Sequence, residues 1–137
     1  RNDLTPILCV GETTEDLEKY GARKVPVDQL SAVLNSIPRG SEIVVAYEPV
    51  WAIGSGQAAT PDQAEDVCRA LRETIQSLHG QEAAESTRIL YGGSVKSTNI
   101  AGFMKRENID GALVGGASLD VDEFVAIARF PQHVSVD

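Results

Sequence analysis

Short apolar runs alternate with longer amphipathic stretches along this chain of 137 residues. The apolar runs cover residues 4–10, 43–47, 88–91 and 111–114. Their residues are apolar almost continuously, whereas a strand with one solvated face would alternate apolar and polar positions. We therefore predict four strands of a parallel sheet that is covered by helices.

The stretches between these runs carry apolar residues at helical spacing. Helices are expected within residues 13–36, 60–80, 98–106 and 120–129. The second has the clearest boundaries, because Thr60 is a favourable N-cap, Pro61 suits the first helical position and Gln63 completes a capping box. Gly80 is the expected stop signal.

Strand and helix thus alternate along the whole chain, without a linker, a low-complexity tract or a block of like charges. This order predicts a single α/β domain over residues 1–137. Its four consecutive βα units amount to about half of a (β/α)8 barrel, which has eight units in about 250 residues.

The formal net charge of −8 narrows the choice of ligands. An acidic surface repels the phosphates of nucleic acids, so no nucleic-acid partner is expected. A small phosphorylated ligand would have to be held by local donors, such as backbone N–H groups at glycine turns and helix N-termini.

The chain shows no apolar run of the roughly 20 residues that cross a bilayer and no signal peptide, so we expect no membrane partner. Cys9 and Cys68 form neither a metal nor a disulfide pattern, which favours reduced thiols in a cytoplasmic protein. Because Cys9 lies in an apolar run, we expect its side chain to be buried.

The most informative stretch is residues 46–56, where an apolar run leads into Glu48 and then into a loop that contains Gly54. A carboxylate at the end of a strand can serve as a general base beneath a mobile loop. Taken alone, Glu48 would be interpreted as a surface carboxylate. The loop after it is too apolar to be simply solvated, which favours a lid that closes over a ligand and desolvates the carboxylate.

Glycine pairs follow the next two strands, in the segments Gly92-Gly93-Ser94 and Gly115-Gly116. Paired glycines let the backbone approach a ligand and can present N–H groups to an anion. In barrels, the loops after the last two strands form a common phosphate site. Each pair also fits an ordinary tight turn, and the sequence leaves both interpretations open.

The remaining polar candidates are weaker. Glu12, at the end of the first run, is expected to orient its neighbours rather than to catalyse. His79 and His133 are not expected to be catalysts, because neither has a partner nearby in the sequence. No cluster of metal ligands and no redox motif occurs, so neither a metal nor a cofactor is expected.

Four segments together resemble the triosephosphate isomerase family, namely residues 9–12, 47–56, 91–95 and 113–117. The resemblance implies that residues 1–137 are the C-terminal half of the family's barrel, units five to eight. It implies that Glu48 is the base that moves a proton between two carbons of dihydroxyacetone phosphate and glyceraldehyde 3-phosphate, under a lid at residues 50–58. The residues that it implies for binding the substrate phosphate are Gly54, Ser94, Gly115 and Gly116.

The same resemblance implies that Tyr91 and Ser94 latch the closed lid. The segment Gln57-Ala58-Ala59, at the far hinge, departs from the family's commoner Lys-Thr-Ala, which bears on the kinetics of the lid. The family is homodimeric, and its catalytic lysine and electrophilic histidine lie in an N-terminal half without a counterpart here.

An open half-barrel would expose two sheet edges, so the expected partner is that N-terminal half or a second copy of this chain. Three alternatives follow from these expectations. The chain is an isomerase that needs its complementary half, a non-catalytic phosphate-binding half-barrel that self-associates, or an inert folding fragment.

Overall fold

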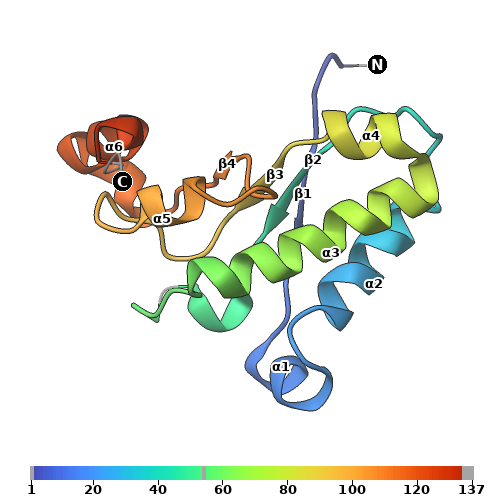
Figure 1. Ribbon diagram of the computed structural model, residues 1–137, viewed down its shortest axis with the longest axis horizontal. Helices are drawn as coiled ribbons and strands as arrows, with labels where there is room; N and C mark the ends of the chain where they lie inside the picture. The colour runs from blue at the N-terminus through green and yellow to red at the C-terminus, as the bar shows by residue number, and fades with distance from the viewer. Residues whose placement is uncertain (1, 54, 134–137) are drawn as a thin grey trace.

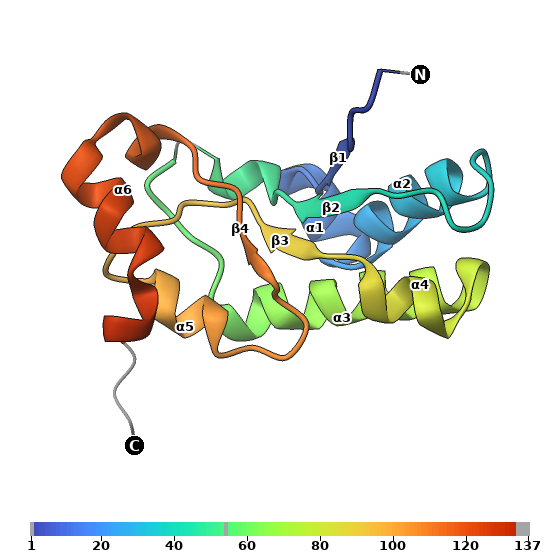
Figure 2. The same ribbon diagram turned by 90° about the horizontal axis from the view of Figure 1, so that it is seen from above.

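The computed structural model describes residues 2–53 and 55–133. Figure 1 and Figure 2 show a small sheet with helices packed beside it. In chain order, the elements are β1 (Ile7–Val10), α1 (Thr14–Tyr20), α2 (Lys24–Leu34), β2 (Val44–Tyr47), η1 (Val50–Ala52), α3 (Pro61–His79), α4 (Gln81–Ser86), β3 (Ile89–Tyr91), α5 (Ile100–Met104), β4 (Gly111–Ala112), η2 (Gly116–Leu119), α6 (Val121–Ala128) and η3 (Phe130–His133).

The four strands form one parallel sheet in the order β1-β2-β3-β4, which confirms the predicted parallel α/β sheet. Their C-terminal ends are aligned, because Val10 lies opposite Tyr47, and Tyr47 lies opposite Tyr91. Tyr91 in turn lies opposite Ala112. β1 and β4 fall furthest short of the predicted apolar runs, because they are edge strands whose outlying residues have a neighbour on one side at most.

Helices cover one face of this sheet. α2 packs against α3 and β1, and α3 also contacts β2 and β3. Figure 2 shows α3, α4 and α5 lying along one side of the strands. The core between these layers is apolar, and its most deeply buried members include Leu30, Val45, Tyr47, Val67, Leu71, Ile75, Ile89, Tyr91 and Phe103.

Side chains on the opposite face of β1 are exposed. Ile7 is 48% exposed and Cys9 is also exposed, whereas Val10, on the covered face, is 2% exposed. The expectation that Cys9 is buried is therefore wrong. Its apolar neighbours are buried only where a helix packs on the strand, and the sequence run does not distinguish the two faces.

The boundaries of α3 are those that the sequence predicts. The Oγ of Thr60 accepts a hydrogen bond from the Gln63 N–H at 3.2 Å, and the Gln63 side chain accepts one from the Thr60 N–H at 2.9 Å. Gly80 ends the helix with a φ of 97°. The mostly helical stretch expected within residues 13–36 contains two helices, because Gly21, with a φ of 78°, ends α1 before α2 begins.

Arg72, on α3, bonds to the two chain segments that lead into β3 and β4. It donates from Nη1 to the carbonyls of Ala84 and Thr87, at 2.6 and 3.0 Å. It also donates from Nε to Asn108 Oδ1 at 3.0 Å and from Nη2 to Asp110 Oδ2 at 2.5 Å. One side chain on α3 thus satisfies acceptors that precede both β3 and β4.

Replacing Arg72 with alanine should lower the free energy of unfolding by about 2–4 kcal/mol, because several partly buried acceptors lose their donor at once. Urea denaturation followed by circular dichroism measures this change. Arg69→Ala is the matched control, because Arg69 is 55% exposed and its ion pair with Glu65 is long, at 3.5 Å. Equal losses in the two variants would contradict the importance of the Arg72 network.

Candidate active site

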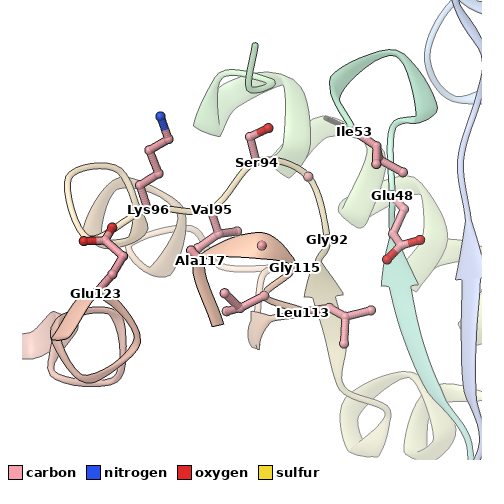
Figure 3. A pocket seen from close by; sticks show the side chains of 13 residues that line it. Glu48, Ile53, Gly92, Ser94, Val95, Lys96, Leu113, Gly115, Ala117 and Glu123 are labelled. Atoms are coloured by element: carbon pink, nitrogen blue, oxygen red, sulfur yellow. The ribbon is translucent and has the colours of Figure 1, made fainter. Parts of the chain in front are cut away.

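A cavity of about 580 Å³ lies at the C-terminal ends of the strands. Its lining includes Glu48, Ser94, Gly115 and Gly116, four of the five residues that the sequence predicts for catalysis and binding. Figure 3 shows their arrangement, with Glu48 toward one side of the cavity and Ser94 and Gly115 nearer its middle. The fifth residue, Gly54, lies outside the described residues.

Two glycines make room for Glu48. A Cβ on Gly11 would lie 1.7 Å from the carbonyl oxygen of Glu48, and a Cβ on Gly92 would lie 2.5 Å from its Cγ. The Glu48 N–H donates to the carbonyl of Val10 at 2.7 Å, which continues the sheet one residue beyond β2. The carboxylate is therefore positioned by backbone packing on both neighbouring strands.

The Cys9 thiol interacts with this carboxylate, both through the charge of Glu48 and through a side-chain hydrogen bond. Partial burial raises the pKa of the Cys9 thiol, and the negative charge and hydrogen bond of Glu48 raise that pKa further. The thiol is thus kept protonated beside the carboxylate.

Glu12 holds the start of the loop that follows β2. It is fully buried, and its Oε1 accepts hydrogen bonds from the Tyr47 hydroxyl and from the Trp51 indole N–H, each at 2.8 Å. Its backbone carbonyl accepts from the Val50 N–H at 2.9 Å. Burial and the charge of Glu12 raise the pKa of Tyr47, so the hydroxyl remains a donor. These contacts agree with the expected orienting role of Glu12.

Residues on β3 and after it contact the same loop near both of its ends. The Ser94 hydroxyl donates to the carbonyl of Ala52 at 2.9 Å, and the Tyr91 hydroxyl accepts from the Ala59 N–H at 3.1 Å. A Cβ on Gly93 would lie 2.1 Å from the Tyr91 hydroxyl, so this glycine is needed for the second contact. These are the two residues expected to latch the lid, although their latching role stays a prediction.

The candidate phosphate donors are backbone N–H groups. Within the described part of the chain, the N–H groups of Ser94, Gly115 and Gly116 donate to no protein acceptor. Gly115 and Gly116 are exposed, and no atom lies within 4 Å of the position of a Cβ on either. Gly116 also begins η2, where the first N–H groups of a helical turn lack internal partners.

Sequence reasoning missed two charged residues of the cavity, Lys96 and Glu123. The Glu123 carboxylate accepts from the Ser97 N–H at 2.7 Å and from the Ser97 hydroxyl at 3.0 Å. Lys96 lies two residues after Ser94, and this spacing was the one available signal for it. Glu123 comes from α6, and nothing in its local sequence marks it as part of the cavity.

The remaining candidates lie elsewhere. His79 Nε2 is 2.8 Å from the Leu34 carbonyl, between α3 and α2, and the side chain of His133 is not among those described. In residues 2–53 and 55–133, no group of three potential metal ligands is found. None of the helices in the same ranges combines the length and the hydrophobicity that a membrane span requires.

A parallel α/β sheet that gathers a carboxylate and glycine turns at the C-terminal ends of its strands defines a protein of the (β/α)-barrel class. The family model for triosephosphate isomerase matches residues 1–131. The chain belongs to the triosephosphate isomerase family.

Curated relatives agree with this assignment. A triosephosphate isomerase from Leifsonia xyli subsp. xyli (strain CTCB07) is 66% identical over 134 residues, which cover 98% of this chain and 52% of the relative. Those from Streptomyces avermitilis and Lactobacillus delbrueckii subsp. lactis are 52% and 48% identical, and the matches cover 95% and 94% of this chain. The chain spans about half the length of the curated relatives it matches.

Alkylation of Cys9 tests the contact between the thiol and Glu48. Because the thiolate is the reactive form, Cys9 should react slowly with iodoacetamide at about pH 7.5 despite its exposure. Glu48→Gln removes a negative charge that disfavours the thiolate, so it should lower the pKa of Cys9 and speed alkylation about two- to fivefold.

Mass spectrometry of the labelled protein measures this rate. Cys68 is fully buried and should stay unlabelled while the protein is folded. Glu107→Gln removes the same charge from an exposed turn and serves as the control. Equal rates in the two variants would contradict the contact.

Proposed function

We propose that this chain is the C-terminal half of a triosephosphate isomerase and forms one domain over residues 1–137. Joined to its complementary half, it interconverts dihydroxyacetone phosphate and glyceraldehyde 3-phosphate. The observation that carries this proposal is the placement of Glu48 in one cavity with the unpartnered N–H groups of Ser94, Gly115 and Gly116. A base and a set of anion donors suit a substrate with a reacting carbon at one end and a phosphate at the other.

In this proposal Glu48 is the base. Its carboxylate takes a proton from the carbon beside the carbonyl group, which leaves an enediolate, and returns the proton to the neighbouring carbon. The reaction moves hydrogen within one molecule and consumes no electron acceptor. Ile53 lines the same cavity and is 52% exposed, so closure of residues 50–58 would bury this side chain and exclude water from the enediolate.

The phosphate is assigned to backbone donors. Ser94, Gly115 and Gly116 supply N–H groups at the cavity, and the family resemblance assigns another donor to Gly54, which lies outside the described residues. This choice of donors fits the net charge of −8, which leaves few lysine and arginine side chains to spare for an anion.

The isomerase needs a second half. The N-terminal half supplies the lysine and the electrophilic histidine of the family, and it covers the exposed side chains of β1. Loss of one group that stabilises the charge of the enediolate costs about 10²–10³ in rate, so the isolated chain should be nearly inactive. The complete protein would be a cytoplasmic homodimer.

A non-catalytic half-barrel that binds phosphate and self-associates is the second candidate. It is favoured by a run of exposed apolar side chains on η2 and α6, namely Leu119, Val121, Phe124 and Val125. Neighbouring exposed apolar side chains are typical of a surface that contacts another protein. Both candidates use the same glycine turns, and they differ in their need for Glu48.

The isomerisation rate of dihydroxyacetone phosphate separates the two candidates. It should be measured for this chain alone and for this chain mixed with the N-terminal half of the Leifsonia xyli relative. We expect activity only in the mixture, and Glu48→Gln should lower it by about 10²–10⁴-fold because the base is lost. Glu107→Gln, on an exposed turn, should leave the rate unchanged.

Full activity in the Glu48→Gln mixture would refute the proposed base. An inactive mixture in which both halves bind each other would favour the non-catalytic candidate. Activity of this chain alone that disappears with Glu48→Gln would mean that copies of this chain assemble a working site without the family's lysine and histidine.

Gly92→Ala tests the positioning of the base. The new methyl group would lie 2.5 Å from Glu48 Cγ, so the carboxylate must move. Because a displacement of about 1 Å can cost about 10²-fold in rate, the mixture should lose at least about tenfold. Gly102 lies in α5, and a methyl group there would lie 3.2 Å from the Pro61 side chain, so the Gly102→Ala mixture should keep its activity. Similar losses in both variants would contradict the role of Gly92.

A further inference from the structure

The charged side chains around the cavity are more acidic than basic, which disfavours an anionic ligand. Among the described residues that line it, Glu48 and Glu123 are acidic and Lys96 is the one basic residue. The whole chain has a net charge of −8, so the long-range field also disfavours an anion. The backbone donors of the cavity are uncharged and act only at short range.

Lys96 is placed to offset this repulsion. Figure 3 shows its side chain extending from the segment that follows Ser94, at the edge of the cavity. Lys96 is exposed, and its ammonium group forms no ion pair or hydrogen bond with any described residue. The nearby Glu123 carboxylate is already bonded to the N–H and hydroxyl groups of Ser97. The charge of Lys96 therefore remains available to a ligand.

Hydrogen bonds hold the backbone turn from which the Lys96 side chain extends. The Lys96 N–H donates to Asn99 Oδ1 at 2.8 Å, and the Asn99 side chain donates to the Ser94 carbonyl at 2.9 Å. Ser94 and Lys96 are thus held in one hydrogen-bonded turn. The charge of a side chain that starts two residues from a candidate phosphate donor can act on the ligand through space, without contact.

We propose that Lys96 is a positioning residue that attracts the anionic group of the ligand to the N–H groups of Ser94, Gly115 and Gly116. This inference rests on the proposed phosphate site and adds to it a charged residue that acts through space. An exposed ammonium group contributes a modest amount, about two- to fivefold in affinity at low ionic strength. Because its field is screened by salt, this contribution should disappear at about 1 M salt.

The dissociation constant of inorganic phosphate tests the proposal. It is measured for this chain by NMR titration of the Ser94, Gly115 and Gly116 amide signals, at low and at high ionic strength. We expect Lys96→Gln to weaken binding about two- to fivefold at low salt and to have no effect at high salt. Lys96→Arg keeps the charge and should restore the affinity.

Lys105→Gln is the matched control. Lys105 is exposed, lies just after α5 and does not line the cavity, so this variant changes the net charge equally. If Lys96→Gln binds phosphate like Lys105→Gln, or if its effect is the same at high salt, the role of Lys96 is overturned while the glycine site stands. If phosphate shifts none of the three amide signals of the unsubstituted chain, the phosphate site and the role of Lys96 are both overturned.

Discussion

Hydrogen bonding that continues past the ends of the strands is the constraint on which the rest of this structure depends. The Glu48 N–H bonds to Val10, the Gly92 N–H bonds to Tyr47, and the Leu113 N–H bonds to Tyr91, at 2.7, 2.8 and 2.9 Å. In a parallel sheet these bonds bring the residues after each strand to one edge. Without this ladder, the carboxylate and the glycine turns would be separate features of the sequence. With it, they surround one cavity.

The ladder also explains why the loop after β2 is anchored from both sides. Glu12 follows β1 and bonds to Trp51, while Ser94 follows β3 and bonds to the carbonyl of Ala52. Each anchor stands at the end of a neighbouring strand, so their separation is set by the spacing of the sheet. The start of the loop, at Trp51 and Ala52, is therefore held from both sides by residues that the sequence of the loop does not specify.

Structural features that depend on a few neighbouring residues could be predicted well from the sequence. The ends of α3 follow from Thr60, Gln63 and Gly80, because a cap depends on residues within a few positions of one another. The place of Glu48 followed from the run before it. The exposure of Cys9 was not predictable, because it depends on what packs against one face of a strand. The network around Arg72 joins residues far apart in the chain, and a single sequence carries no signal for such contacts.

The indole of Trp51 has a consequence for observing this protein in solution. It is the only tryptophan in the chain, and it lies in the loop after β2 with its N–H bonded to a buried carboxylate. The emission of tryptophan depends on the polarity and hydrogen bonding around the ring. The tryptophan fluorescence of the whole molecule therefore reports on this one loop, and its movements can be followed without attaching a dye.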